Sequence, residues 1–334
     1  MSPSLTLATP RPAPSEPARI PGRSVIALGG NALIHRGERG EFADQLRNLE
    51  NAAAAIVELT EVTSQIALTN GNGPQVGFLA LQAAAAERDV PVPPLDVLGA
   101  ESQGQIGYLL SQALRNAFHA RGVPREVAVV LTQTVVDADD PAFQHPTKPV
   151  GPVYEEAEAH RLAAERGWTV ARDGSHWRRV VPSPRPRRLV EAAVIRRLMQ
   201  ANALVIASGG GGVPVVEDRD GRLRGVEAVI DKDLAAVIVA EEVRAESLIL
   251  LTDVDAVYRG WGTPGHERIE RLQASDAEAL RRAGAFGSGS MEPKVRACVE
   301  FVRAGGRWAA VGALDRAQDV FEGRSGTRIV NDGA

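Results

Sequence analysis

The stretch from Ser24 to Leu33, "SVIALGGNAL", decides the fold class. Its aliphatic run, 24–28, predicts a buried β-strand, and the glycine pair that follows predicts a tight turn. The same order of strand, glycine-rich turn and helix returns after 65–69 and after 203–208. Strands that alternate with Ala-rich helical segments are typical of a parallel sheet wrapped by helices. The sequence therefore predicts an α/β protein.

Hydrophobic periodicity extends this pattern along the chain. Strands are predicted at 24–28, 65–69, 126–136, 203–208, 247–252 and 307–312, and a hairpin is predicted around Asp220 and Gly221. Helices are predicted at 43–60, 75–87, 101–121, 189–201, 232–244, 275–283 and 292–304, before a last helix and strand.

Two segments depart from the pattern. Residues 1–22 carry six prolines and no apolar core of a signal peptide, which predicts a disordered tail. Residues 137–187 are rich in Pro, Gly, His and Trp, and a loop of this length predicts a protruding lid subdomain. The remainder divides into an N-terminal lobe, 23–205, which includes the lid, and a C-terminal lobe, 206–334, on one continuous sheet.

Composition narrows the function classes. A net charge of −4, with no basic tract, argues against a nucleic-acid partner. No stretch has the apolar length of a membrane span. The single cysteine, Cys298, lies in a helical pattern and is predicted to be a buried small hydrophobe. One cysteine forms no internal disulfide, which fits a cytoplasmic location.

The glycine-rich turns predict an anion site. In an open α/β sheet, ligands bind beyond the carboxyl ends of the strands, so these turns should line one crevice. Glycine lets backbone N–H groups approach a ligand oxygen, although each turn alone also fits simple packing of helix against strand. The turns contain Gly29, Gly30 and Asn31, then Gly71, Asn72 and Gly73, then Gly209, Gly210, Gly211 and Gly212.

Lysine usage points to the same crevice. Lys and Arg total 38, yet only Lys148, Lys232 and Lys294 are lysine. A lysine offers a compact, mobile charge that can follow a moving phosphate, and aspartates can hold it in place. In "VIDKD" either flanking carboxylate, Asp231 or Asp233, could organise Lys232, although Asp231 also fits an N-cap. Neither standard nucleotide signature, the Walker A loop or the Rossmann fingerprint, is present.

Eight motifs together resemble the carbamate kinases of the amino acid kinase superfamily, from about residue 24 to 330. They are "VIALGGNAL", "NGNGPQVG", "PTKPVGP", "WRRVVPSP", "GGGGVPVV", "GVEAVIDKD", "LTDVDAVY" and "GSMEPKV". The resemblance implies an open αβα sandwich with a mainly parallel eight-stranded sheet and a homodimer. It also implies reversible phosphoryl transfer between ATP and carbamate with Mg²⁺, running in cells toward ATP from carbamoyl phosphate in arginine or ureide breakdown. The Mg²⁺ would be held mainly through the nucleotide phosphates, so no protein metal ligand is predicted.

The resemblance also implies residue roles. Lys148 on the lid and Lys294 would hold the transferring phosphoryl group, Lys232 would assist at the phosphates, and Asp233 would orient the lysines. The first two glycine turns would frame carbamate and the phosphoryl group, and Gly209 to Gly212 would close the site. These four glycines would also bind the nucleotide, in a pocket with Thr252, Asp253, Val254 and Tyr258.

Two positions bear on this assignment. Related acylphosphate kinases carry a lysine where this chain has Ala27, which argues against acetylglutamate kinase. The family commonly has His where this chain has Asn70, which hydrogen-bonds but carries no charge. If this position contacts the ligand, the level of activity or its pH dependence could shift, but activity should not be lost. The alternatives are an enzyme of the same fold that acts on another small carboxylate, and a non-catalytic ligand sensor.

Overall fold

The main sheet is mixed but mostly parallel. The computed structural model describes residues 20–30, 33–34, 38, 40–286 and 291–333, and in this part of the chain eight strands follow the order β15-β17-β16-β12-β1-β2-β9-β3. Every neighbouring pair is parallel except β16 with β17. The predicted fold class is therefore confirmed. The strands are β1 (Ile20–Leu28), β2 (Gln65–Asn70), β3 (Val127–Val130), β9 (Leu204–Ala207), β12 (Ala245–Thr252), β15 (Arg271–Gln273), β16 (Trp308–Ala313) and β17 (Thr327–Val330).

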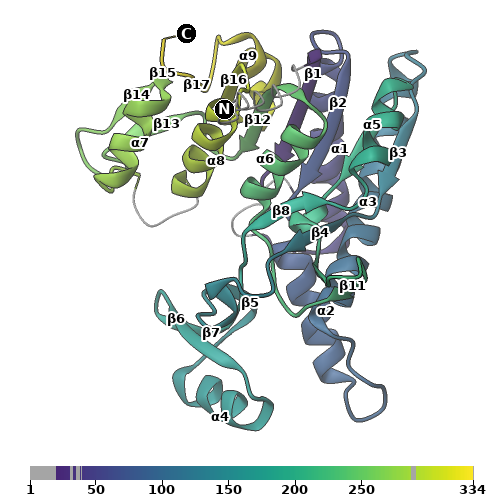
Figure 1. Cartoon of the computed structure of the whole chain (residues 1–334), viewed down its shortest axis with the longest axis vertical. Helices are drawn as coiled ribbons and strands as arrows, with labels where there is room; N and C mark the ends of the chain where they lie inside the picture. Colours follow the sequence, from purple (N-terminus) through teal and green to yellow (C-terminus); the bar gives the residue numbers. More distant parts are fainter. Residues whose placement is uncertain (1–19, 31–32, 35–37, 39, 287–290, 334) are drawn as a thin grey trace, which may run out of the picture.

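Both faces of this sheet are apolar, because successive side chains of a strand point to opposite faces. In β1, Val25 and Ala27 pack into one core, and Ile26 and Leu28 pack into the other. Helices cover both cores, which gives the three layers of Figure 1. One core contains α5 (Ala192–Gln200), α6 (Lys232–Glu242), α7 (Ala274–Arg282) and α8 (Met291–Arg303). The other contains α1 (Phe42–Leu59), α3 (Leu95–Ala120) and α9 (Ala317–Glu322).

The apolar run 126–136 is not one strand, so that prediction was wrong. The chain leaves the main sheet after β3 and joins a second sheet as β4 (Gln133–Val136). Between them, the Gln103 side chain holds the backbone of Thr132, accepting from its N–H at 3.0 Å and donating to its carbonyl at 3.1 Å. The second sheet has the order β11-β10-β4-β8, with β8 (Pro186–Leu189). Its β10 (Val213–Glu217) and β11 (Leu223–Gly225) form the predicted hairpin.

Residues 137–187 contain a small subdomain, called the lid below, with a three-stranded antiparallel sheet in the order β5-β7-β6. It extends away from the main sheet in Figure 1. Val150 and Val181 at its base pack against Val76 of α2 (Gly73–Ala85) and against α3. The lid consists of β5 (Lys148–Tyr154), α4 (Glu156–Arg166), β6 (Thr169–Asp173) and β7 (His176–Val181), after the short helix η2 (Pro141–Phe143).

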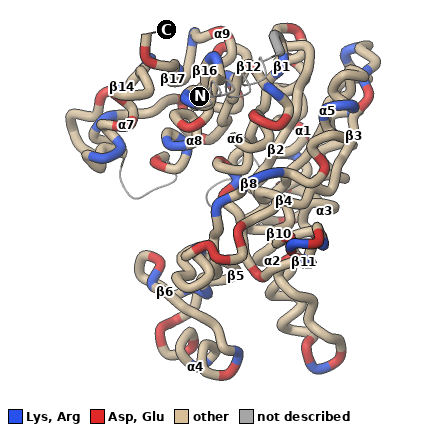
Figure 2. Tube along the Cα trace, viewed as in Figure 1, with Lys and Arg blue, Asp and Glu red and all other residues tan. Residues whose placement is uncertain are grey.

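Strand β1 begins at Ile20, so residues 20–22 belong to the sheet and not to the predicted tail; residues 1–19 lie outside the described residues. Lys and Arg (blue) and Asp and Glu (red) are interspersed along the chain (Figure 2). Among the helices described, none is long and apolar enough to cross a membrane. The remaining elements are β13 (Val257–Arg259), β14 (Glu267–Ile269), η3 (Gly209–Gly211) and η4 (Leu314–Arg316).

Candidate active site

Three glycine-rich turns meet at the carboxyl ends of β1, β2 and β9, which are neighbours in the main sheet. The Gly71 N–H donates to the Leu28 carbonyl at 3.1 Å, which joins the second turn to the first. Gly210 has a φ of +65°, and a Cβ there would lie only 2.1 Å from Asn72 Nδ2, so the third turn fits closely over the second. The three turns therefore contact one another at this edge of the sheet.

Asp233 holds two of the three lysines. Its Oδ1 accepts a hydrogen bond from Lys232 Nζ at 2.7 Å, and its Oδ2 accepts one from Lys294 Nζ at 3.2 Å. The side chains of Asp233 and Lys294 are only 6% and 5% exposed. A buried charge needs a partner of opposite sign, and here one carboxylate serves two ammonium groups. Asp233 lies in the first turn of α6 and Lys294 in the first turn of α8.

Lys148 joins them from the lid. Its Nζ lies 3.0 Å from Asp231 Oδ2. The other oxygen of Asp231 caps α6, accepting from the backbone N–H groups of Asp233 at 2.9 Å and Leu234 at 3.2 Å. The N-cap expected of Asp231 is therefore confirmed, and the same carboxylate also binds the lid lysine.

The pKa values of these groups follow from burial and from their neighbours. Burial alone would raise the pKa of Asp231, but the charge of Lys148 and its hydrogen bond hold that pKa below 3.8. Burial would lower the pKa of Lys232, but the adjacent Asp233 outweighs it and raises that pKa. Burial and then the like charge of Lys232 lower the pKa of Lys294. An anion that approaches Lys294 would stabilise its charged form.

These groups surround a cavity of about 260 Å³. It is lined by parts of the glycine turns (Gly30, Gly71, Asn72, Gly73 and Gly210), by the three lysines, by Asp231 and Asp233, and by Pro74, Val76, Pro149, Val150, Val229, Ile230 and Pro293. A larger cavity, of about 350 Å³, lies between the lid and α2, and none of the three lysines lines it. The small basic cavity thus has the features of a site for a small anion.

Four predicted glycines, Gly29, Gly209, Gly211 and Gly212, do not line this cavity. A Cβ on Gly29 would meet the Leu251 carbonyl at 3.1 Å, so Gly29 permits close contact of β1 with β12. Likewise, Gly209, Gly211 and Gly212 pack against Gln103, Ile230 and Thr134. Asn31 lies outside the described residues.

The predicted nucleotide pocket follows β12. Thr252 ends β12 beside Gly29, and its hydroxyl donates to Asp253 Oδ1 at 3.0 Å. Tyr258 lies in β13, where its hydroxyl contacts Asp255 and its ring lies 5.1 Å from that of Trp261. Neither Thr252, Asp253, Val254 nor Tyr258 lines the 260 Å³ cavity.

The pairing of Lys148 with Asp231 is the contact that sequence reasoning missed, because the two residues are 83 positions apart. The only signal was the presence of two carboxylates around Lys232. Asn70 is buried beside the site, and its Nδ2 donates to the Gly71 carbonyl at 3.0 Å.

The chain is similar to known proteins over most of its length. The family model described as "Amino acid kinase family" matches residues 22–312. A carbamate kinase from Pyrococcus horikoshii is 48% identical over 93% of this chain and 99% of its own length, and one from Haemophilus influenzae is 47% identical over 92% and 96%. The structure of a Giardia lamblia carbamate kinase bound to AMP-PNP has a TM-score of 0.87 and 43% identity, covering 94% of this chain and 99% of the other.

The chain belongs to the amino acid kinase family, and within that family to the carbamate kinases. The enzyme is therefore a kinase, a transferase of phosphoryl groups.

Proposed function

We propose that Lys148, Lys232 and Lys294 stabilise a phosphoryl group as it moves between carbamate and a nucleotide, with Asp233 as the residue that organises the lysines. One observation carries the proposal: the Asp233 carboxylate binds Lys232 and Lys294, and Lys148 binds the neighbouring Asp231, all at one cavity. Phosphoryl transfer requires positioning and cancellation of charge, and three mobile ammonium groups supply both.

The cavity suits the smaller substrate. Gly30, Gly71 and Gly73 line the cavity without side chains, and α2 begins at Gly73, so the positive end of its dipole lies at the cavity. Carbamate and the phosphoryl group would bind between these groups and the lysines. The carbamate oxygen and the nucleotide oxygen would then lie on opposite sides of the phosphorus, in line for transfer. Lys148 would approach with the lid and exclude water.

ATP and ADP are the proposed nucleotide substrates. The Giardia relative binds AMP-PNP, which supports this choice. In our proposal the nucleotide lies beside β12 and contacts Thr252, Asp253, Val254 and Tyr258, next to the first glycine turn.

Mg²⁺ would arrive on the nucleotide phosphates and neutralise their charge. The cavity offers two carboxylates, and both already bind ammonium groups. No group of three or more His, Cys, Asp or Glu suited to a metal occurs in the portion of the chain described. These residues fit a metal that is held by phosphate rather than by a protein cage.

The proposal includes the physiological setting implied by the sequence. The enzyme would form ATP from ADP and carbamoyl phosphate during arginine or ureide catabolism, as a cytoplasmic homodimer. These three properties are predictions, and metabolite analysis, analytical ultracentrifugation and fractionation would test them.

A coupled assay for ATP formed from ADP and carbamoyl phosphate tests the reaction. Lys148→Met and Lys294→Met should each reduce turnover about 100-fold or more, because each removes a charge that stabilises the transition state. Circular dichroism checks that both variants fold. Turnover close to that of wild type in both would refute the assigned roles. Activity on another small carboxylate, or ligand binding without turnover, would favour the two alternative functions.

A further inference from the structure

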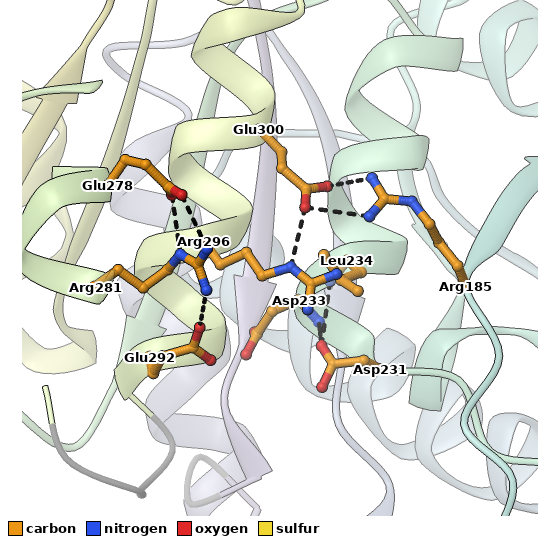
Figure 3. A network of polar contacts seen from close by, with 9 residues as sticks. All are labelled: Arg185, Asp231, Asp233, Leu234, Glu278, Arg281, Glu292, Arg296 and Glu300. Atoms are coloured by element: carbon orange, nitrogen blue, oxygen red, sulfur yellow. Dashed lines mark hydrogen bonds and ion pairs between the residues drawn. The ribbon is translucent and has the colours of Figure 1, made fainter. Parts of the chain in front are cut away.

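An ion pair outside the cavity joins the root of the lid to α8. Both Nη atoms of Arg185 contact the carboxylate of Glu300, at 2.6 and 3.3 Å. Arg296, one turn earlier on α8, also donates to Glu300, at 3.0 Å. Figure 3 shows Glu300 between the two guanidinium groups, with Arg185 reaching it from a different segment. A two-point contact of arginine with carboxylate fixes orientation as well as distance.

Arg185 lies where the chain returns from the lid to the body. It directly precedes β8, and its backbone N–H donates to Asp140 Oδ2 at 2.9 Å. Asp140 belongs to the segment that enters the lid, and its other oxygen caps η2. The entering and leaving segments are therefore tied together at the residue that holds α8.

A short, stiff path leads from Arg185 to Lys148. Pro182, Ser183 and Pro184 separate Arg185 from β7, and each proline fixes its φ. Val181 at the end of β7 pairs with Lys148 in β5, and the Thr147 N–H donates to the Val181 carbonyl at 3.2 Å. The position of Arg185 thus limits where Lys148 can be.

The other end of the ion pair leads to Lys294. Glu300 and Lys294 are both on α8, about 9 Å apart along the helix axis at the usual rise per residue. The path from Lys148 through β7, Arg185 and Glu300 to Lys294 therefore connects two of the three lysines without crossing the cavity.

We infer that Arg185 and Glu300 are positioning residues, which anchor the pivot of the lid on α8 and so set Lys148 relative to Lys294 during phosphoryl transfer. The inference rests on the proposed function of these lysines. Neither residue lines the 260 Å³ cavity. Arg185 and its neighbour Arg296 both line an adjoining cavity that also contacts Lys148 and Asp231, and we assign the role of Arg185 to placing Lys148 rather than to binding substrate. The pair holds the pivot while the lid beyond it remains able to close.

Arg185→Gln tests the inference, with Arg296→Gln as the matched control. Both variants remove one guanidinium partner of Glu300, but only Arg185 belongs to the lid root. In Arg185→Gln we expect kcat/KM for carbamoyl phosphate to fall about three- to fivefold, a size suited to a partly exposed ion pair. The KM for ADP and the thermal unfolding temperature should stay unchanged. Arg296→Gln should match wild type.

A double-mutant comparison separates positioning from general destabilisation. In a Lys148→Arg background, which already misplaces the lid cation, Arg185→Gln should have little further effect. Hydrogen exchange in the peptides that cover 143–150 and 180–187 should be faster in Arg185→Gln alone. Equal losses of kcat/KM in Arg185→Gln and Arg296→Gln would overturn the inference. So would fully additive effects of Arg185→Gln and Lys148→Arg, or hydrogen exchange in Arg185→Gln equal to that of wild type. If wild type forms no ATP, the proposed function fails, and the exchange comparison alone decides whether the pair anchors the lid.

Discussion

Lys294 and Asp233 are 61 residues apart in the sequence, and their side chains meet at 3.2 Å in the buried wall of the cavity. This contact joins the beginning of α8 to the beginning of α6. Because Asp233 also binds Lys232, its removal would take one shared carboxylate from the buried Lys294 and from the partly exposed Lys232.

Asp233→Asn should therefore both inactivate and destabilise the enzyme. We expect turnover to fall about 100-fold or more, and the free energy of unfolding to fall by about 3–5 kcal/mol, the usual range for breaking a buried pair. Inorganic phosphate should raise the unfolding temperature of the variant more than that of wild type, since the anion replaces the lost charge.

Asp276→Asn is the control for this experiment, since Asp276 is exposed in the first turn of α7. It should change stability by less than about 1 kcal/mol. Thermal unfolding with and without phosphate makes the comparison, and a stable, active Asp233→Asn enzyme would contradict the shared role of Asp233.

Gly71→Ala should damage the site without unfolding the protein. A Cβ at this position would lie 3.0 Å from Lys232 Cδ and 3.3 Å from the Gly30 nitrogen. The lysine must then shift, and a displacement of about 1 Å at a reacting centre can cost about 100-fold in rate. We expect kcat to fall at least about tenfold, measured by the coupled assay.

Gly104→Ala provides the opposite case. Gly104 is exposed in α3, and a Cβ added there would meet no atom of another segment within 4 Å. Alanine should leave turnover unchanged and increase stability by about 0.5–1 kcal/mol, because it favours the helix. Equal activity in the two glycine variants would argue against a close fit at Gly71.

Lys148→Met should raise the pKa of Asp231. In the wild-type enzyme the Lys148 charge keeps that pKa below 3.8 against the effect of burial. A lowered carboxyl pKa stabilises the fold above pH 3.8, and this stability is lost as the pH falls through the folded-state pKa. The variant should therefore begin to lose stability at a higher pH than wild type.

Carboxyl-carbon NMR titration of Asp231 measures this change directly. Lys148→Arg retains a cation on the lid, although in a different position, and should raise the pKa of Asp231 less than Lys148→Met does. Identical Asp231 titrations in Lys148→Met and wild type would show that the ion pair is not maintained in solution.

Cys298 should not react in the native enzyme. Its side chain is fully buried in α8, and burial raises the pKa of the thiol. After incubation with a maleimide, intact-mass spectrometry should find no adduct on native protein and one adduct in guanidinium chloride. An adduct on the folded enzyme would indicate that α8 opens locally.

The fold was largely predictable because its signals are local. Alternation along β1 places Val25 and Ile26 in different cores, and the glycine turns mark where the strands end. The prediction of one strand over 126–136 was wrong because an apolar sequence does not show where the chain passes from one sheet to another. At that change of sheet Gln103, a residue of the preceding helix α3, holds the backbone of Thr132, and this contact between two elements is not visible in the apolar pattern.

The site was predictable only in part. Lysine scarcity and the "VIDKD" motif identified the charged groups, but the partner of each lysine depends on how three segments pack. The N-cap role of Asp231 is local and is visible in the sequence. Its contact with Lys148 depends on the position of the lid, which the sequence does not show.

Three ammonium groups and two carboxylates line the cavity, so its lining carries an excess of one positive charge before any substrate arrives. Inorganic anions, which are abundant in the cell, would bind in this positively charged cavity. Catalytic efficiency should therefore depend on the ionic medium, with sulfate and phosphate acting as competitors of carbamoyl phosphate.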